Sequence, residues 1–221
     1  MSRWETRIAL ILLPATLIFM APAEAVEEAK PGLATEILET LPVKGRAPKT
    51  GYSRAEFGQT WADVNRNGCD TRNDILKRDL ISISYKAKTR DCVVLAGVLV
   101  DRYSGETINF VRGNISSMEV QIDHVVALSN AWQTGAFKLT KIERTALAND
   151  PLNLFAVIGR LNSQKSDGDA ATWLPPLKSF RCAYVAQQIA VKAKYSLWVT
   201  APEKSAMVGI LAKCPMQVAP S

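Results

Sequence analysis

Apolar residues recur along the chain at spacings that predict both strands and helices. Runs rich in β-branched residues at 93–100 and 107–111 flank a Gly-containing segment, which is typical of a β-hairpin. Apolar stretches at 121–128 and 152–158 predict two further strands. At 179–198 the apolar residues repeat at helical spacing, so we expect the longest helix there. This mixture, without an internal repeat, indicates an α+β fold.

Polar residues indicate where other helices begin. Thr140 with Glu143 has the pattern of a capping box, and that helix should run through Ala148. Thr200 with Glu203 has the same pattern and begins a last helix. This last helix is expected to end near Lys213. Shorter helices are expected over 35–41, from about Thr71 to Leu80, from Ser129 to Trp132 and from about Ser163 onward.

The first residues have the pattern of a targeting signal. Arg3 and Arg7 precede an apolar run at 8–20, and Ala23 and Ala25 are small residues at both cleavage positions. The run is short for a helix that crosses a bilayer. We therefore expect a secretory signal peptide over residues 1–25, with an uncleaved membrane anchor as the alternative.

After the signal, the composition predicts a linker and one domain. Residues 26–50 mix proline, glycine and lysine with one short helical pattern, so we expect a linker there. Residues 51–221 are expected to form a single domain, and no later segment is apolar for long enough to span a membrane. The formal net charge of +6 is compatible with a polyanionic partner, although by itself it is a weak signal.

The four cysteines favour disulfides over a metal site. No two of them form a C-x-x-C pair, and the single histidine does not complete the usual zinc ligand sets. In an oxidising compartment two disulfides are expected. Proximity in the sequence favours Cys69–Cys92 with Cys182–Cys214, and the two other connectivities stay open.

A loop near the start of the predicted domain has two interpretations. Asp63, Asn65 and Asn67 before Gly68 fit the opening of a calcium loop, and Asp74 falls where such a loop has its last ligand. That ligand is normally a longer glutamate. The alternative, which we favour, is an Asx/Gly turn that leads into the next helix.

A carboxylate and an imidazole stand side by side in the predicted strand 121–128. Asp123 directly precedes His124, the only histidine of the chain. Successive side chains of a strand point to opposite faces, so both residues serve one site only where the strand ends or twists. Taken alone, His124 more often has a structural role, bonded to a backbone carbonyl.

Polar residues further along the chain favour a functional role for His124 over a structural one. Asn153 begins the returning strand, and Asn162 lies one helical turn before Lys165. An imidazole, a carboxylate and amide oxygens on a strand–strand–helix frame are the residue types that metal-assisted hydrolysis needs.

The stretch 121–165 resembles the HNH endonuclease (ββα-metal) superfamily. It is most similar to secreted HNH family proteins with cores that read QIDHVVAL, ANDPLNL and N-x-x-K. These look like the C-terminal nuclease domains of some modification-dependent restriction enzymes. The likeness is strongest from Gln121 to Trp173. It implies a ββα-metal core with an added hairpin and flanking helices.

The resemblance also implies a role for each matching residue. His124 would be the general base that takes a proton from the attacking water. Asp123 and Asn162 would bind one divalent metal, and Asn153 would tie backbone segments together and orient the histidine. Lys165 would hold a phosphate. The third letter of the motif is Asn here, not His, which points to Mg²⁺ or Mn²⁺ rather than Zn²⁺.

Other polar and aromatic residues are weaker candidates. Asn149 and Asp150 are more simply explained as a helix end before Pro151. The three tryptophans Trp132, Trp173 and Trp198 are expected to fill the core. Basic residues that would contact backbone phosphate, each with a solvated surface role as the alternative, are Lys138, Lys141, Arg160, Arg181, Lys192 and Lys194.

The expected function is therefore that of a secreted, metal-dependent endonuclease of low sequence specificity. DNA is favoured over RNA as substrate, no stable membrane insertion is expected after signal cleavage, and a monomer is favoured. A catalytically inactive nucleic-acid-binding protein and a structural module with the same core are the alternatives. With an ordinary histidine pKa near 6.5, cleavage should fall as pH drops through that value.

Overall fold

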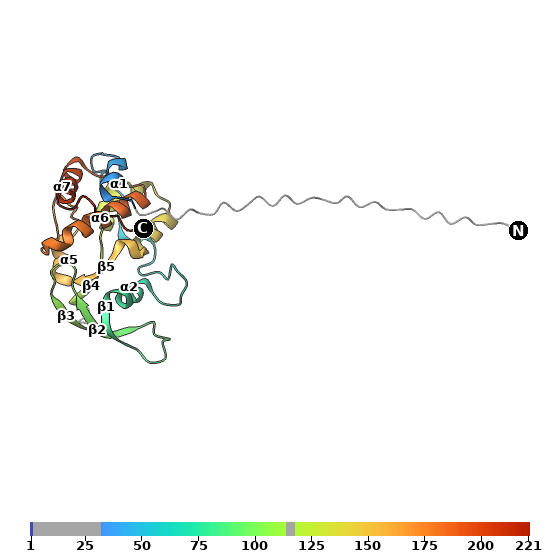
Figure 1. The fold of residues 1–221 in the computed structure, drawn as a ribbon. Helices are drawn as coiled ribbons and strands as arrows, with labels where there is room; N and C mark the ends of the chain where they lie inside the picture. Colours follow the sequence, from blue (N-terminus) through green and yellow to red (C-terminus); the bar gives the residue numbers. More distant parts are fainter. Residues whose placement is uncertain (2–31, 114–117) are drawn as a thin grey trace.

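The computed structural model describes Met1, residues 32–113 and residues 118–221 (Figure 1). Apart from Met1, the expected signal peptide lies outside the described residues. Within the described ranges, no helix is long and apolar enough to cross a membrane. The elements are α1 (Ala34–Thr40), η1 (Arg54–Phe57), α2 (Thr71–Asp79), β1 (Leu80–Tyr85), β2 (Val94–Val100), β3 (Thr107–Val111), β4 (Val120–His124), α3 (Leu128–Gln133), η3 (Ala136–Lys138), α4 (Lys141–Asn149), η4 (Pro151–Asn153), β5 (Leu154–Ile158), α5 (Gly159–Lys165), η5 (Lys178–Phe180), α6 (Arg181–Lys194) and α7 (Ala201–Leu211).

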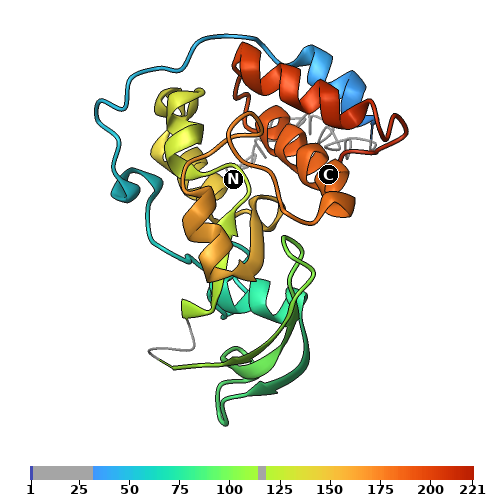
Figure 2. The same ribbon diagram turned by 90° about the vertical axis from the view of Figure 1, so that its left-hand side faces the viewer.

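A three-stranded antiparallel sheet in the order β1-β2-β3 forms one end of the molecule. Figure 2 shows it in green, at the opposite end from the red and blue helices α7 and α1. The predicted hairpin of β2 and β3 is confirmed, with Leu99 paired to Ile108. Strand β1 was not predicted, although its residues 81–85 alternate apolar and polar side chains. Strand β1 follows α2 without a break, so the sequence does not mark where the helical spacing of apolar residues changes to the alternation of a strand.

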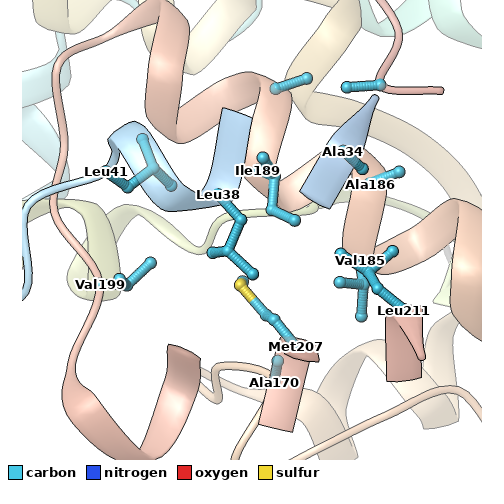
Figure 3. Packing of buried hydrophobic residues seen from close by; sticks show 12 residues of the cluster. Ala34, Leu38, Leu41, Ala170, Val185, Ala186, Ile189, Val199, Met207 and Leu211 are labelled. Carbon is cyan, nitrogen blue, oxygen red and sulfur yellow. The ribbon is translucent and has the colours of Figure 1, made fainter. Parts of the chain in front are cut away.

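Helices α1, α6 and α7 enclose the largest apolar cluster (Figure 3). Leu38 of α1 is buried against Ile189 and Met207. The backbone N–H of Ala34 also donates to the carbonyl of Gln217. The helix predicted over 35–41 is therefore confirmed, and it packs on the core instead of belonging to a free linker, whereas residues 44–49 form no helix or strand and are mostly exposed. The sequence of a short amphipathic helix does not indicate whether the helix packs against the rest of the protein or stays in solvent.

The longest helix is shorter than the periodicity predicted. Helix α6 ends at Lys194, because Ser196 adopts a left-handed conformation with φ 51° and Leu197 donates its N–H back to the carbonyl of Lys192. Lys192 was expected to contact phosphate or to lie on the solvated surface, but its side chain is fully buried. Its Nζ lies 2.8 Å from Oε1 of Glu203, the capping-box glutamate of α7. Burial of the ammonium requires this counter-charge.

Strands β4 and β5 pair antiparallel and lead directly into α5. Helix α5 begins at Gly159, earlier than the predicted start at Ser163. The absence of a side chain matters here, because a Cβ on Gly159 would lie 2.0 Å from the carbonyl oxygen of Met118. Helix α3 likewise begins at Leu128 and has Ala127, not the predicted Ser129, at its N-cap. The early start of α5 places Asn162 and Lys165 inside that helix.

Both predicted disulfides are confirmed. Cys69–Cys92 joins the loop before α2 to the segment before β2, and Cys182–Cys214 joins α6 to the residues after α7. Their loops span sequence separations of 23 and 32 residues. On the chain-entropy estimate each contributes roughly 3 kcal/mol by restricting the unfolded chain.

The loop at 63–68 is closed by its own hydrogen bonds. Oδ1 of Asn65 accepts from the backbone N–H of Asn67 (3.2 Å) and Oδ1 of Asn67 accepts from that of Cys69 (2.7 Å), which are the bonds to a residue two positions on that define an Asx turn. The side-chain amides of Asn65 and Asn67 donate to Asp74. These bonds agree with the turn interpretation, and calcium binding by Asp63, Asn65 and Asn67 stays a prediction.

Candidate functional site

The last two residues of β4 border a pocket of about 410 Å³, which we call the Asp123 pocket. Asp123 and His124 are only 4% and 8% exposed. Both border the same pocket because the strand ends at His124. Asn162 of α5 borders it as well, so the structure brings together three of the predicted site residues. The other lining residues are Lys49, Tyr52, Arg54, Ile122, Ala127, Leu128, Ser129, Ser166 and Asp167.

The His124 ring is held in one tautomer by the end of α4. Its Nε2 lies 2.9 Å from the carbonyl oxygen of Ala148. A carbonyl only accepts hydrogen bonds, so Nε2 carries the proton and Nδ1 of the neutral ring keeps a free lone pair. Burial lowers the pKa of His124 from 6.5 to about 4. The expected fall in activity as pH drops through the His124 pKa stays a prediction, and this burial moves it to a pH below 6.5.

Asp123 is fixed through both carboxylate oxygens. Oδ2 accepts from the hydroxyl of Tyr103 at 2.5 Å, and Oδ1 accepts from Nζ of Lys165 at 2.9 Å. Tyr103 is fully buried, and this burial raises the pKa of its hydroxyl well above 10. Tyr103 is therefore a permanent donor to Asp123. Each oxygen of Asp123 keeps a second lone pair for a ligand.

Lys165 does not lie where a phosphate contact would need it. Its side chain has no exposed area, and Nζ donates to Asp123 and to the backbone carbonyl of His124 at 2.7 Å. The expectation that Lys165 holds a phosphate is therefore wrong. The early start of α5 directs the side chain beneath β4, where it compensates the buried charge of Asp123.

Asn153 is fully buried and joins three backbone segments. Its Oδ1 accepts from the N–H of Val126 at 2.8 Å, and its Nδ2 donates to the carbonyls of Val126 and Leu147, both at 3.3 Å. These bonds tie the segment after His124 to the end of α4, next to the carbonyl that holds the His124 ring. They are the bonds that an orienting residue needs, and its effect on catalysis stays a prediction.

Oxygen atoms from two predicted ligands face the Asp123 pocket. Nδ2 of Asn162 donates to Oε1 of Gln121 at 2.8 Å, which leaves its Oδ1 free for a cation. The described residues contain no group of three or more His, Cys, Asp or Glu side chains that could hold a metal. A hard cation that keeps most of its water needs only one or two carboxylates. Asp123 and Asn162 could therefore hold such a cation, and the metal stays a prediction.

Asp167 is a second carboxylate on this pocket that the sequence did not single out. Its Oδ2 accepts from Lys49 at 2.7 Å and from the hydroxyl of Ser129 at 3.0 Å. The hydrogen bond from Lys49 lowers the pKa of Asp167, so the group stays ionised. It adds negative charge beside Asp123 and Asn162.

Arg54 and Trp61 were also missed. Arg54 borders both the Asp123 pocket and a second pocket of about 270 Å³, which we call the Trp61 pocket. The Trp61 ring lies nearly parallel to the His124 ring, with centroids 6.0 Å apart and an interplanar angle of 11°. The available sequence signal was the aromatic and basic content of 52–61, which has no spacing that identifies a site.

Most of the weaker candidate residues lie away from the two pockets or have structural roles. None of the basic residues considered as phosphate contacts borders either pocket. Lys192 is buried, as described above, and Lys194 pairs with Asp150 at 2.7 Å. The helix end predicted at Asn149 is confirmed, yet Asn149 also borders the Trp61 pocket. Trp132 and Trp198 are buried, as expected.

Comparison with known proteins identifies the family to which the chain belongs. Residues 70–210 match the family described as "GmrSD restriction endonucleases, C-terminal domain". A protein of the fungus Arthroderma benhamiae, named "Uncharacterized secreted protein", is 37% identical over 183 residues, which cover 82% of this chain and 84% of the relative. No solved structure matches the chain. The match covers more than half of the chain and contains Asp123, His124, Asn153 and Asn162, and the chain therefore belongs to the family of GmrSD restriction endonuclease C-terminal domains.

Proposed function

We propose that this protein is a secreted, metal-dependent HNH endonuclease that hydrolyses phosphodiester bonds of nucleic acid. DNA is the favoured substrate, with little sequence specificity. The family match supports nuclease chemistry, and the two disulfides together with the secreted relative support an extracellular or periplasmic location. The observation that carries the proposal is the neutral His124 ring, held by Ala148 with Nδ1 free, next to Asp123 and Asn162.

His124 would act as the general base. Its Nδ1 can accept the proton of a water molecule that attacks the phosphorus, because the ring is neutral at pH 7. The bond from Nε2 to Ala148 fixes the ring and disperses the positive charge that forms after proton transfer. Asn153 stabilises this arrangement because it bonds both to Val126, which follows His124, and to Leu147, which precedes Ala148.

Asp123 and Asn162 would hold one hard cation, for which Mg²⁺ or Mn²⁺ is proposed. When bound, such an ion neutralises negative charge on the scissile phosphate. Lys165 and Tyr103, neither of which lines the pocket, hold the Asp123 carboxylate in place. Arg54, which lines the pocket, would contact a neighbouring phosphate.

The test uses the purified, disulfide-bonded protein and supercoiled plasmid. Wild type should nick the plasmid with Mg²⁺ or Mn²⁺ and not with EDTA. His124→Gln keeps an amide that can bond Ala148 but has no basic nitrogen, so it should cut at least about a hundredfold more slowly. Lys213→Ala, a change at an exposed position after α7, is the matched control and should nick at the wild-type rate.

Two results would count against the proposal. Nicking that continues in His124→Gln would exclude the histidine base. Plasmid that is retarded in a gel but stays intact with every metal would favour the alternative, an inactive nucleic-acid-binding protein.

A further inference from the structure

The Trp61 pocket adjoins the Asp123 pocket across the His124 ring. The two share Arg54, His124 and Leu128 and are otherwise lined by different residues. The walls of the Trp61 pocket are mostly apolar, and none of its lining residues carries a carboxylate. The residues that line only this pocket are Phe57, Gly58, Gln59, Thr60, Trp61, Ala148 and Asn149.

Trp61 gives this pocket a flat aromatic wall. Its ring is half-buried and is nearly parallel to the His124 ring. The backbone of Trp61 is left-handed, with φ 57°, which is unusual for a bulky residue. Its carbonyl accepts from the N–H of Thr71 at the start of α2, and this bond helps to hold the conformation. The backbone that carries this ring is therefore restrained beside the proposed general base.

Asn149 supplies an acceptor that has no partner. The residue is 1% exposed, and its Nδ2 donates to the carbonyl oxygens of Thr145 (2.9 Å) and Gln59 (3.5 Å). Because carbonyls only accept, these bonds fix the amide orientation. Oδ1 is then left buried without a hydrogen bond from any described residue. Buried polar atoms are rarely unpaired, and because Asn149 lines the Trp61 pocket, a molecule bound there could supply the missing donor.

Arg54 places a positive charge between the two pockets. Its side chain is exposed, and no hydrogen bond or ion pair joins its guanidinium to another described residue. An unpaired guanidinium is a good partner for phosphate oxygens. A molecule that fills both pockets would therefore place an anionic group at Arg54.

An aromatic wall, a buried acceptor and a neighbouring cation fit one chemical class, a nucleotide with an unpaired base. The bases stack well on aromatic rings, and their Watson–Crick edges carry N–H donors. In a duplex those edges are paired and the faces are stacked. Resting on the proposed nuclease function, we propose that the Trp61 pocket binds the unpaired base next to the scissile phosphate, so that the preferred substrate is single-stranded or locally unpaired nucleic acid.

Part of the proposed base pocket is built by residues that the family match does not include, whereas His124, Leu128, Ala148 and Asn149 lie within the match. Residues 54–61 precede the matched range 70–210. Of these, Trp61 has its ring nearly parallel to the ring of His124. Strand preference would accordingly depend on a segment outside the matched domain.

The experiment measures affinity apart from cleavage. A fluorescent single-stranded DNA oligonucleotide, its duplex and the same strand with abasic sites are titrated with wild-type protein in EDTA, and anisotropy reports binding. The intact single strand should bind on the order of tenfold or more tightly than the duplex or the abasic strand. Equal affinity for the intact and abasic strands, or no binding of any strand, would overturn the proposal.

Variants test whether Trp61 causes the difference in affinity between the intact and abasic strands. Trp61→Ala should bind the intact single strand about tenfold to a hundredfold more weakly and should no longer distinguish it from the abasic strand. Trp61→Phe should keep most of the affinity. Phe137→Ala, which removes an exposed aromatic side chain away from both pockets, is the matched control and should behave as wild type. Wild-type affinity in a folded Trp61→Ala variant would also overturn the proposal.

The binding test addresses the base pocket and the plasmid test addresses the nuclease, so either proposal can be contradicted without the other. Base-dependent binding without metal-dependent nicking would sink the nuclease proposal and keep the base pocket. Nicking together with binding that does not depend on the bases would support the nuclease proposal and contradict the proposed base pocket. If Trp61→Ala does not fold, the comparison of intact and abasic strands with wild-type protein decides alone.

Discussion

The ammonium of Lys165 lies 2.9 Å from Oδ1 of Asp123, and both side chains are almost entirely shielded from water, with 0% and 4% of their areas exposed. This pair joins α5 to the end of β4 beneath the Asp123 pocket. Nζ also donates to the carbonyl of His124, so one side chain supports both residues of the Asp-His dipeptide.

The first prediction concerns this buried ion pair. Lys165→Met leaves the carboxylate of Asp123 buried without its charge partner, so the free energy of unfolding should fall by about 3–5 kcal/mol in urea denaturation. Lys194→Met removes a half-exposed lysine from Asp150, which keeps the hydroxyl of Tyr195 as a partner, and it should cost about 1 kcal/mol or less. Equal losses in the two variants would contradict the role given to Lys165.

The second prediction concerns pH and the stability of the metal-free protein. The folded pKa of His124 is about 4, whereas the unfolded chain has the ordinary value of 6.5. Between these values the unfolded chain binds a proton that the folded protein does not, so stability falls as pH is lowered from 6.5 to 4. The full loss is on the order of 3 kcal/mol.

Thermal or urea denaturation in EDTA across pH 4 to 7 measures this loss. His124→Gln lacks the titrating group, so its stability should change less with pH than that of wild type over the same window. Parallel curves for the two proteins would show that burial of His124 does not lower its pKa.

The third prediction concerns the amide of Asn153. Asn153→Asp keeps the acceptor for Val126 but turns an oxygen toward the carbonyls of Val126 and Leu147, and it buries a charge. The free energy of unfolding should fall by about 2 kcal/mol or more. In the folded fraction, kcat should fall more than KM rises, because the His124 ring loses its alignment. Asn109→Asp, at an exposed position of β3, should change neither quantity.

The fourth prediction concerns two glycines in helices. Gly159→Ala would place a Cβ 2.0 Å from the carbonyl oxygen of Met118 and 3.0 Å from the amide of Gln121, the partner of Asn162. We expect a loss of about 1–3 kcal/mol. Gly209→Ala meets nothing within 4 Å in α7, so it should stabilise the protein by about 0.5–1 kcal/mol. Calorimetry of both variants measures the contrast.

Local patterns in the sequence were enough for several elements. Both capping boxes, Thr140 with Glu143 and Thr200 with Glu203, form as predicted, because all their atoms lie within one turn of chain. The hairpin of β2 and β3 follows from the β-branched runs and the turn between them. The Asp-His dipeptide at a strand end, with Asn153 and Asn162 downstream, was sufficient to identify where the candidate site lies.

Burial and distant contacts decided the rest. The docking of α1 on α6 and α7 depends on a surface formed by residues far away in the sequence. The start of α5 at Gly159 sends Lys165 beneath Asp123 instead of toward a phosphate. Arg54 and Trp61 reach His124 only because the chain before α2 folds over the end of α4. The sequence determined which groups are present and their local conformations, whereas the tertiary structure determined which are buried, which are paired and which face the pockets, because desolvation and charge compensation depend on neighbours that no local pattern contains.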